Sequence, residues 1–135
     1  SLPTKGLAFI SLKDRHKNEG VDLAKQLIKL GFTLCGTEGT ANRIIKNGIK
    51  CKKINKVSGG SPHIIDVLNS KKIALVINTG GGKRAYRIQD STSLRRSTLI
   101  NKVPYCTNMS TAYAFLEAIK SLKTKKIEVK SLQEI

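Results

Sequence analysis

Aromatic side chains are scarce in this sequence, tryptophan is absent, and long apolar runs are missing. Phe, Tyr and Trp make up 4% of the 135 residues. No RNP, KH or zinc-finger signature accompanies them, so the stacking platforms and base-reading elements of nucleic-acid-binding proteins are not indicated. The longest apolar run, at residues 73–77, has the length of a strand and falls far short of the roughly 20 residues that span a membrane. We therefore expect neither a nucleic-acid partner nor a membrane protein.

Cysteine is also rare, and its spacing excludes two kinds of site. Cys35, Cys51 and Cys106 are an odd number and form no C-x-x-C pair, so neither a disulfide framework nor a zinc site is indicated. The first residues lack the apolar core and cleavage site of a secretory signal. We expect buried, idle thiols, no bound metal and a cytoplasmic location.

Acidic residues number only 9 against 25 lysines and arginines, which gives a net charge of +16. A charge of this size favours anionic partners. Many of the lysines lie on the polar faces of expected helices, where a solvated surface is the ordinary explanation. Because charge alone predicts only non-specific attraction to nucleic acid, a small anion remains the better-supported kind of ligand.

Apolar periodicity alternates along the chain between strand-like and helical. This alternation predicts right-handed βαβ crossovers and a parallel sheet, in a single α/β domain over residues 1–135. Residues 123–135 are expected to form a basic tail that includes an edge strand at 127–129. The other expected strands are 6–11, 32–35, 49–54, 73–77 and 103–106, and the expected helices are 21–30, 41–47, 62–68, 90–101 and 110–122.

A short polar segment between the second strand and the second helix is the first candidate binding site. In parallel sheets ligands bind beyond the carboxyl ends of the strands, where unpaired N–H groups of helix N-termini attract anions. Gly39 lets the backbone approach a ligand closely, and the hydroxyls of Thr37 and Thr40 suit phosphate oxygens. The alternative is that Thr37 or Thr40 merely caps the helix, and the sequence leaves the two interpretations even.

Matching groups follow the other strands. Ser11 and Lys17 come after the first strand, Lys56 after the third, and Asn78 and Thr79 after the fourth. Lysines neutralise a phosphate dianion, while an amide orients a base or sugar. Any single lysine is more often a solvated surface charge, but their shared position at strand ends favours a common phosphate site.

A glycine-rich loop at residues 80–82 precedes Lys83. It matches neither the P-loop pattern nor G-x-G-x-x-G, so ATP hydrolysis and dinucleotide binding are not indicated. A lid that orders over an anion and an ordinary exposed loop are equally compatible with it.

Candidate catalytic groups do not form a recognisable set. His16, His63, Glu38 and Asp66 lie near these loops, yet no Ser/His/Asp or Cys/His arrangement is visible by spacing. We therefore expect no catalytic residue in this chain.

Six short segments together resemble a known family. They are GLAFIS at residues 6–11 with Lys17, GF leading to TEGTA at 37–41, NKV at 55–57, PHI at 62–64, VINT at 76–79 and LRRS at 94–97. The chain resembles the methylglyoxal-synthase-like domain, and specifically the C-terminal allosteric domain of the carbamoyl-phosphate synthase large chain. The resemblance spans nearly the whole chain and implies that it is a piece of a larger enzyme.

The resemblance implies a Rossmann-like three-layer α/β/α fold with a five-stranded parallel sheet. It also implies binding of UMP or IMP as effector, with no cofactor in this domain. The parent enzyme would use ATP and Mg to make carbamoyl phosphate from bicarbonate and glutamine-derived ammonia, for pyrimidine and arginine biosynthesis. Its implied partners are the remainder of the large chain and a glutaminase small subunit.

The resemblance also carries over to individual residues. Thr107 resembles the threonine of an ornithine effector site at the boundary with the neighbouring domain. The chain departs from the family after Asn78, where Thr79 is followed by three glycines and Lys83 stands in place of an arginine. The implied nucleotide-binding positions are Ser11, Lys17, Thr37, Thr40, Lys56 and Asn78.

A free-standing methylglyoxal synthase is the alternative. That sister enzyme takes its base from an aspartate in a Gly-Asp-Gln-Gln segment, whereas the corresponding stretch here is Ser-Pro-His at residues 61–63. A phosphate site without its base should hold a ligand but abstract no proton. The sequence therefore favours a binding module over a lyase.

Overall fold

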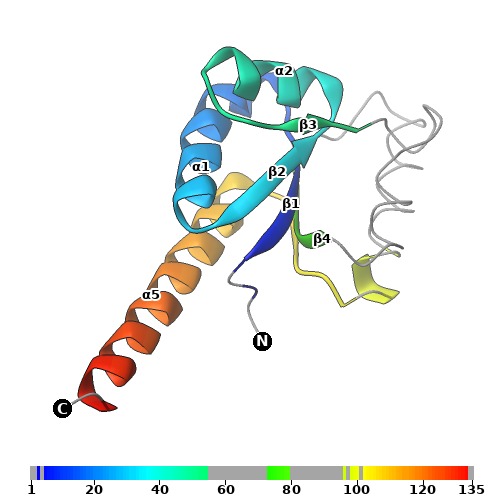
Figure 1. Ribbon diagram of the computed structural model, residues 1–135. Helices are drawn as coiled ribbons and strands as arrows, with labels where there is room; N and C mark the ends of the chain where they lie inside the picture. The colour runs from blue at the N-terminus through cyan, green and yellow to red at the C-terminus, as the bar shows by residue number, and fades with distance from the viewer. Residues whose placement is uncertain are drawn as a thin grey trace.

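A computed structural model of the chain describes residues 3, 5–54, 73–79, 96, 98–100 and 102–133. Within these residues one parallel sheet of five strands has the order β3-β2-β1-β4-β5 (Figure 1). The predicted five-stranded parallel sheet is thereby confirmed. The strands are β1 (Gly6–Ser11), β2 (Phe32–Gly36), β3 (Lys52–Lys53), β4 (Ile73–Asn78) and β5 (Tyr105–Cys106), and the helices are the 3₁₀ turn η1 (Asp14–His16), α1 (Lys17–Lys29), α2 (Glu38–Lys46) and α5 (Met109–Gln133).

The strand order reverses between β1 and β4. From β1 the chain moves outward to β2 and β3, and it then returns to the other side of β1 to place β4 and β5. Ser11 and Asn78, the last residues of β1 and β4, are paired in register. A reversal of this kind leaves a crevice at the carboxyl ends of the two strands, which is where doubly wound sheets bind ligands.

The central strands β1 and β4 are buried on both faces, which explains why they are largely apolar. Ala8 and Ile10 of β1 pack in one core with side chains of α1, α2 and α5, and Figure 1 shows α1 and α5 along the same side of the sheet. Phe9 points to the opposite face and packs with Cys35 and Val76. This alternation confirms the expected layered α/β architecture.

The three cysteines are free and buried, as expected. Burial raises the pKa of the Cys35 thiol to about 12 and the pKa of the Cys51 and Cys106 thiols to about 11 each. Because the thiolate is the reactive form, these side chains are inert packing groups.

Several predicted boundaries shift in the structure. The first helix begins at Lys17 and the second at Glu38, earlier than the apolar pattern indicated, because their first turns consist of polar residues and glycine and so carry no apolar signal. Gly31 and Gly48 follow the two helices with φ of +102° and +81°, as the predicted C′ positions require. The third strand shortens to Lys52–Lys53. The helix expected at 62–68 lies outside the described residues, as does most of the one at 90–101.

The edge strand expected at residues 127–129 is wrong. Helix α5 continues to Gln133, so most of the expected tail is helical. The segment has no Gly or Pro to end the helix, and Lys, Glu, Leu and Gln are good helix formers, so they outweigh the β-branched Ile127 and Val129. Figure 1 shows the end of α5 projecting beyond the sheet.

A polar seam fixes α5 to α1. The Tyr113 hydroxyl lies 3.0 Å from Asp22 Oδ2 and 3.1 Å from the Glu19 carbonyl oxygen. Two lysines of α5 complete the seam: Lys120 donates to Gln26, and Lys123 donates to the carbonyl oxygen of Leu30 at the end of α1. The last of these contacts satisfies a carbonyl group that the helix itself leaves free.

The Tyr113 phenol should make stability depend on pH in the alkaline range. Burial, together with the hydrogen bond to Asp22, raises the pKa of Tyr113 from 10.0 to about 12. Since the folded-state pKa exceeds the unfolded value, this contribution is fully present below pH 10 and is lost as pH rises from about 10 to about 12. We expect Tyr113→Phe to remove one late phase from a phenolate absorbance titration and to lower the free energy of unfolding by about 1 kcal/mol. Loss of a phase near pH 10 in place of the late one would contradict the contact of Tyr113 with Asp22.

Candidate anion-binding site

Hydrogen-bond donors from three segments meet at the carboxyl ends of β1 and β2. The segments are the end of β1, the start of α1 and the start of α2, and the residues are Ser11, Lys17, Thr37, Gly39 and Thr40. We call these five residues the anion cradle. They are predicted site residues that the structure brings together.

Thr37 does not use its side chain to cap α2. It occupies the N-cap position with extended backbone, but its side chain makes no capping hydrogen bond. Thr37 Oγ1 instead donates to Ser11 Oγ at 3.2 Å and lies 3.5 Å from Thr40 Oγ1. The capping alternative is therefore wrong for the Thr37 side chain. As at other helix N-termini, the first N–H groups of α2 still need hydrogen-bond partners from outside the helix.

Thr40 ties the start of α2 to the loop after β1. Its side chain is buried, and Oγ1 accepts a hydrogen bond of 3.0 Å from the Leu12 N–H. This bond joins residues far apart in sequence and holds the two sides of the cradle at a fixed separation. A buried N–H without this acceptor would carry a large desolvation cost.

Lys17 brings its ammonium group from α1 to the start of α2. An ideal Cβ on Gly39 would lie 3.0 Å from Lys17 Nζ, so the absence of a side chain at Gly39 makes room for the lysine. The Lys17 side chain is 15% exposed, whereas Gly39 itself is exposed. A ligand that reaches the Gly39 backbone would therefore meet the ammonium group as well.

Thr79 holds the loop after β1 against the end of β4. Its N–H donates to the Ser11 carbonyl oxygen at 2.9 Å, and its Oγ1 accepts from the Lys13 N–H at 3.2 Å and lies 3.0 Å from His16 Nδ1. The hydroxyl is thus engaged within the protein. Direct contact of Thr79 with a ligand stays a prediction.

Asn78 is held at the end of β4 by the neighbouring strand. Its Nδ2 donates to the Tyr105 hydroxyl oxygen of β5 at 3.0 Å. This contact fixes the plane of the amide group beside the crevice at Ser11, its register partner. Asn78 therefore lies at the predicted edge of the sheet, next to the cradle.

Of the last five candidate residues, the structure describes Thr107 and not the other four. Lys56 and Lys83 lie outside the described residues, as do His63 and Asp66. Thr107 follows β5 and is exposed, with no hydrogen bond to a cradle residue among those that the structure describes. Its predicted role at a domain boundary stays a prediction.

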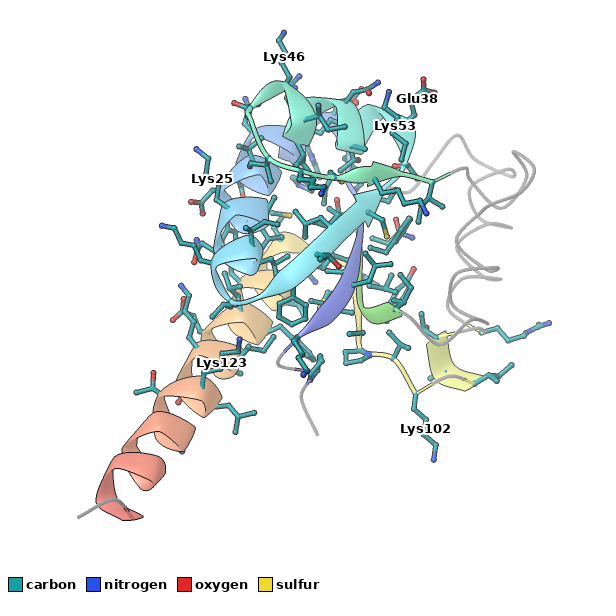
Figure 2. All side chains as sticks on the ribbon, in the orientation of Figure 1. Lys25, Glu38, Lys46, Lys53, Lys102 and Lys123 are labelled. Carbon is teal, nitrogen blue, oxygen red and sulfur yellow. The ribbon has the colours of Figure 1, made fainter. Side chains whose placement is uncertain are left out.

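The donor set of the cradle suits an oxyanion. Hydroxyl groups, an ammonium group and backbone N–H groups can all donate to phosphate oxygens, and the dipole of α2 adds positive potential at its N-terminus. Among the described residues no group of three or more His, Cys, Asp and Glu side chains could hold a metal ion. Glu38 opens α2, but it is exposed and its side chain points outward (Figure 2).

Sequence reasoning missed two residues of this site. Asp14 forms an ion pair with Lys17, with 2.5 Å between Oδ1 and Nζ. Its position three residues before a lysine at a helix start could have indicated the pair. Tyr105 could have been found as the last polar side chain before a strand ends. His16, considered as a catalytic group, instead contacts Thr79.

Comparison with known proteins places this chain in a family. The family model described as "MGS-like domain" matches residues 19–107. The chain belongs to the MGS-like domain family. This match begins within α1 and ends just after β5, so it includes Thr37, Gly39 and Thr40 of the cradle, while Ser11 and Lys17 lie before its first residue.

Relatives of this MGS-like chain are large enzymes of which it spans a small part. It is 44% identical over 98% of its length to the carbamoyl phosphate synthase large chain of Mesorhizobium japonicum, but covers 11% of that protein. Proteins named as the C-terminal section of this large chain are 45% identical in Aquifex aeolicus and 43% in Methanopyrus kandleri. In both cases the alignment covers 99% of this chain, and it covers 26% and 24% of those proteins.

A solved structure shows the same fold. Methylglyoxal synthase from Elizabethkingia anophelis superposes with a TM-score of 0.63 at 19% identity, over 85% of this chain and 79% of that one. At this identity the likeness concerns the fold alone. In the described part of the MGS-like chain, no helix has the length and apolar character needed to cross a membrane.

Proposed function

We propose that this chain is the nucleotide-binding regulatory domain of a carbamoyl-phosphate synthase large chain. Its ligand is UMP or IMP, and the phosphate group binds in the anion cradle. The observation that carries the proposal is the position of Lys17 Nζ beside Gly39, at the N-terminus of α2. Relatives named as the C-terminal section of the synthase large chain, similar over 99% of this chain, support it.

The parent enzyme supplies the chemistry in this proposal. Other parts of the large chain bind ATP and Mg and make carbamoyl phosphate, and a glutaminase small subunit delivers ammonia. Nucleotide binding regulates this cytoplasmic synthase by linkage, because a ligand that binds one state of the enzyme more tightly shifts the equilibrium by that difference. Thr107, exposed after β5, belongs to the boundary with the neighbouring domain.

Calorimetry on the 135-residue chain tests the ligand. We expect UMP or IMP to bind, inorganic phosphate to bind more weakly and to compete with the nucleotide, and uridine and inosine to show no binding at the same concentrations. The phosphate group supplies the charge-assisted hydrogen bonds, so its removal should cost more than removal of any other part of the ligand. Equal binding of uridine and UMP would place the recognition elsewhere.

The methylglyoxal synthase alternative is tested by turnover. With dihydroxyacetone phosphate the chain is expected to release no methylglyoxal, because residues 61–63 provide no carboxylate to act as the base. Release of methylglyoxal and phosphate would replace the regulatory proposal with a lyase.

A further inference from the structure

The ammonium group of the cradle already has an anionic partner within the chain. Lys17 Nζ donates to Asp14 Oδ1 at 2.5 Å. The two side chains differ sharply in exposure: the Lys17 side chain is 15% exposed, while that of Asp14 is 96% exposed. The ion pair therefore has a fixed, largely enclosed cation and a carboxylate at the surface.

Local structure places this carboxylate beside the cradle. Asp14 is the first residue of η1, and Lys17 is the first residue of α1 directly after it, so the pair has i,i+3 spacing. Lys17 Nζ lies at the same time against Gly39. One carboxylate oxygen thus contacts the ammonium group that the cradle would offer to a ligand. Glu38, the acidic residue in the first turn of α2, is exposed and forms no ion pair with Lys17.

We infer that Asp14 is an internal counter-ion that limits the affinity of the cradle for phosphorylated ligands. The inference rests on the proposed function and adds a residue that sets ligand affinity. An arriving phosphate must either displace the carboxylate from Lys17 or bind next to a like charge, and both cost free energy. Asp14 thereby raises the ligand concentration at which the site is half occupied.

The sign of the effect separates this role from its opposite. If Asp14 served to hold Lys17 in a binding-ready position, removal of its charge would weaken the binding of phosphate. As a counter-ion it competes, so removal of its charge strengthens binding. Exposed ion pairs contribute little free energy. We therefore expect removal of the Asp14 charge to raise the affinity for phosphate by about threefold to fivefold at low ionic strength. The gain should shrink as salt screens the carboxylate.

Asp14→Asn and a matched control test the inference. The side chain is almost fully exposed, so the substitution leaves the core untouched. Glu117→Gln is the control, because Glu117 also forms an exposed i,i+3 pair with a lysine, Lys120, at 3.2 Å, but on α5. Both variants raise the net charge by the same amount. Titrations with inorganic phosphate and with UMP, at low and high salt, measure the dissociation constants.

Four outcomes decide whether Asp14 acts as a counter-ion. Tighter binding by Asp14→Asn at low salt, with Glu117→Gln equal to wild type, supports the inference, and so does binding detected only in Asp14→Asn. Equal or weaker binding by Asp14→Asn overturns it, while wild-type binding keeps the proposed function standing. Absence of binding by every variant overturns both, because no cradle for anions would then exist.

Discussion

Replacement of Lys17 with alanine is expected to weaken binding of UMP, IMP and inorganic phosphate by at least about tenfold, the scale of one charge-assisted hydrogen bond. Its ammonium group lies 3.0 Å from the position of a Cβ on Gly39 and is largely enclosed, so water cannot replace its hydrogen bonds at no cost. All three ligands should lose affinity by a similar factor, since the contact is to the phosphate that they share. Titration calorimetry on the 135-residue chain measures the change.

Lys25→Ala provides the matched control for this variant. Lys25 lies on the same helix, is exposed and points away from the sheet (Figure 2). The two substitutions remove the same charge, so general attraction between a basic protein and an anion is reduced equally. If Lys25→Ala weakens binding as much as Lys17→Ala, the attraction is non-specific and the cradle is not the site.

Replacement of Thr40 with valine is expected to lower the free energy of unfolding by about 1–3 kcal/mol. Valine keeps the shape of the side chain, but the Leu12 N–H loses its buried acceptor at 3.0 Å. The same change should weaken phosphate binding, because the loop after β1 is no longer held to the start of α2. Urea denaturation gives the stability and calorimetry gives the affinity.

A second threonine distinguishes the lost hydrogen bond from the chemistry of the substitution. Thr33 lies on β2 with an exposed side chain, and its hydroxyl is 3.5 Å from the Gly6 carbonyl oxygen, at the limit of a hydrogen bond. Thr33→Val is expected to change stability by no more than about 0.5 kcal/mol, as surface substitutions usually do. Equal stability of the Thr40 and Thr33 variants would show that the Leu12 contact contributes nothing.

The fold was predictable because its strongest signals are local. Residues 73–77 are continuously apolar, as a strand covered on both faces requires, and β4 lies inside the sheet between β1 and β5. Glycines after α1 and α2 marked the helix ends correctly. Polar first turns and the long α5 were harder, because exposed helical residues carry no apolar period and β-branched side chains at Ile127 and Val129 imitate a strand.

The site was predictable only as a set of candidates. The rule that parallel strands end at one edge is enough to group Ser11, Lys17 and Thr37 from the sequence alone. The sequence could not say how their hydrogen bonds are shared. The Thr79 hydroxyl forms hydrogen bonds within the protein, and Asp14 forms an ion pair with Lys17. Both contacts depend on the geometry of the turn after β1, and the apolar periodicity of the sequence does not predict that geometry.

A structure of the chain crystallised with UMP tests the central claim most directly. The claim is that the cradle holds the phosphate group of a ligand. We expect the phosphate oxygens within hydrogen-bond distance of Lys17 Nζ and the Gly39 N–H, with the Asp14 carboxylate displaced from its present position 2.5 Å from Lys17 Nζ. A nucleotide bound with its phosphate away from the start of α2 would contradict the account.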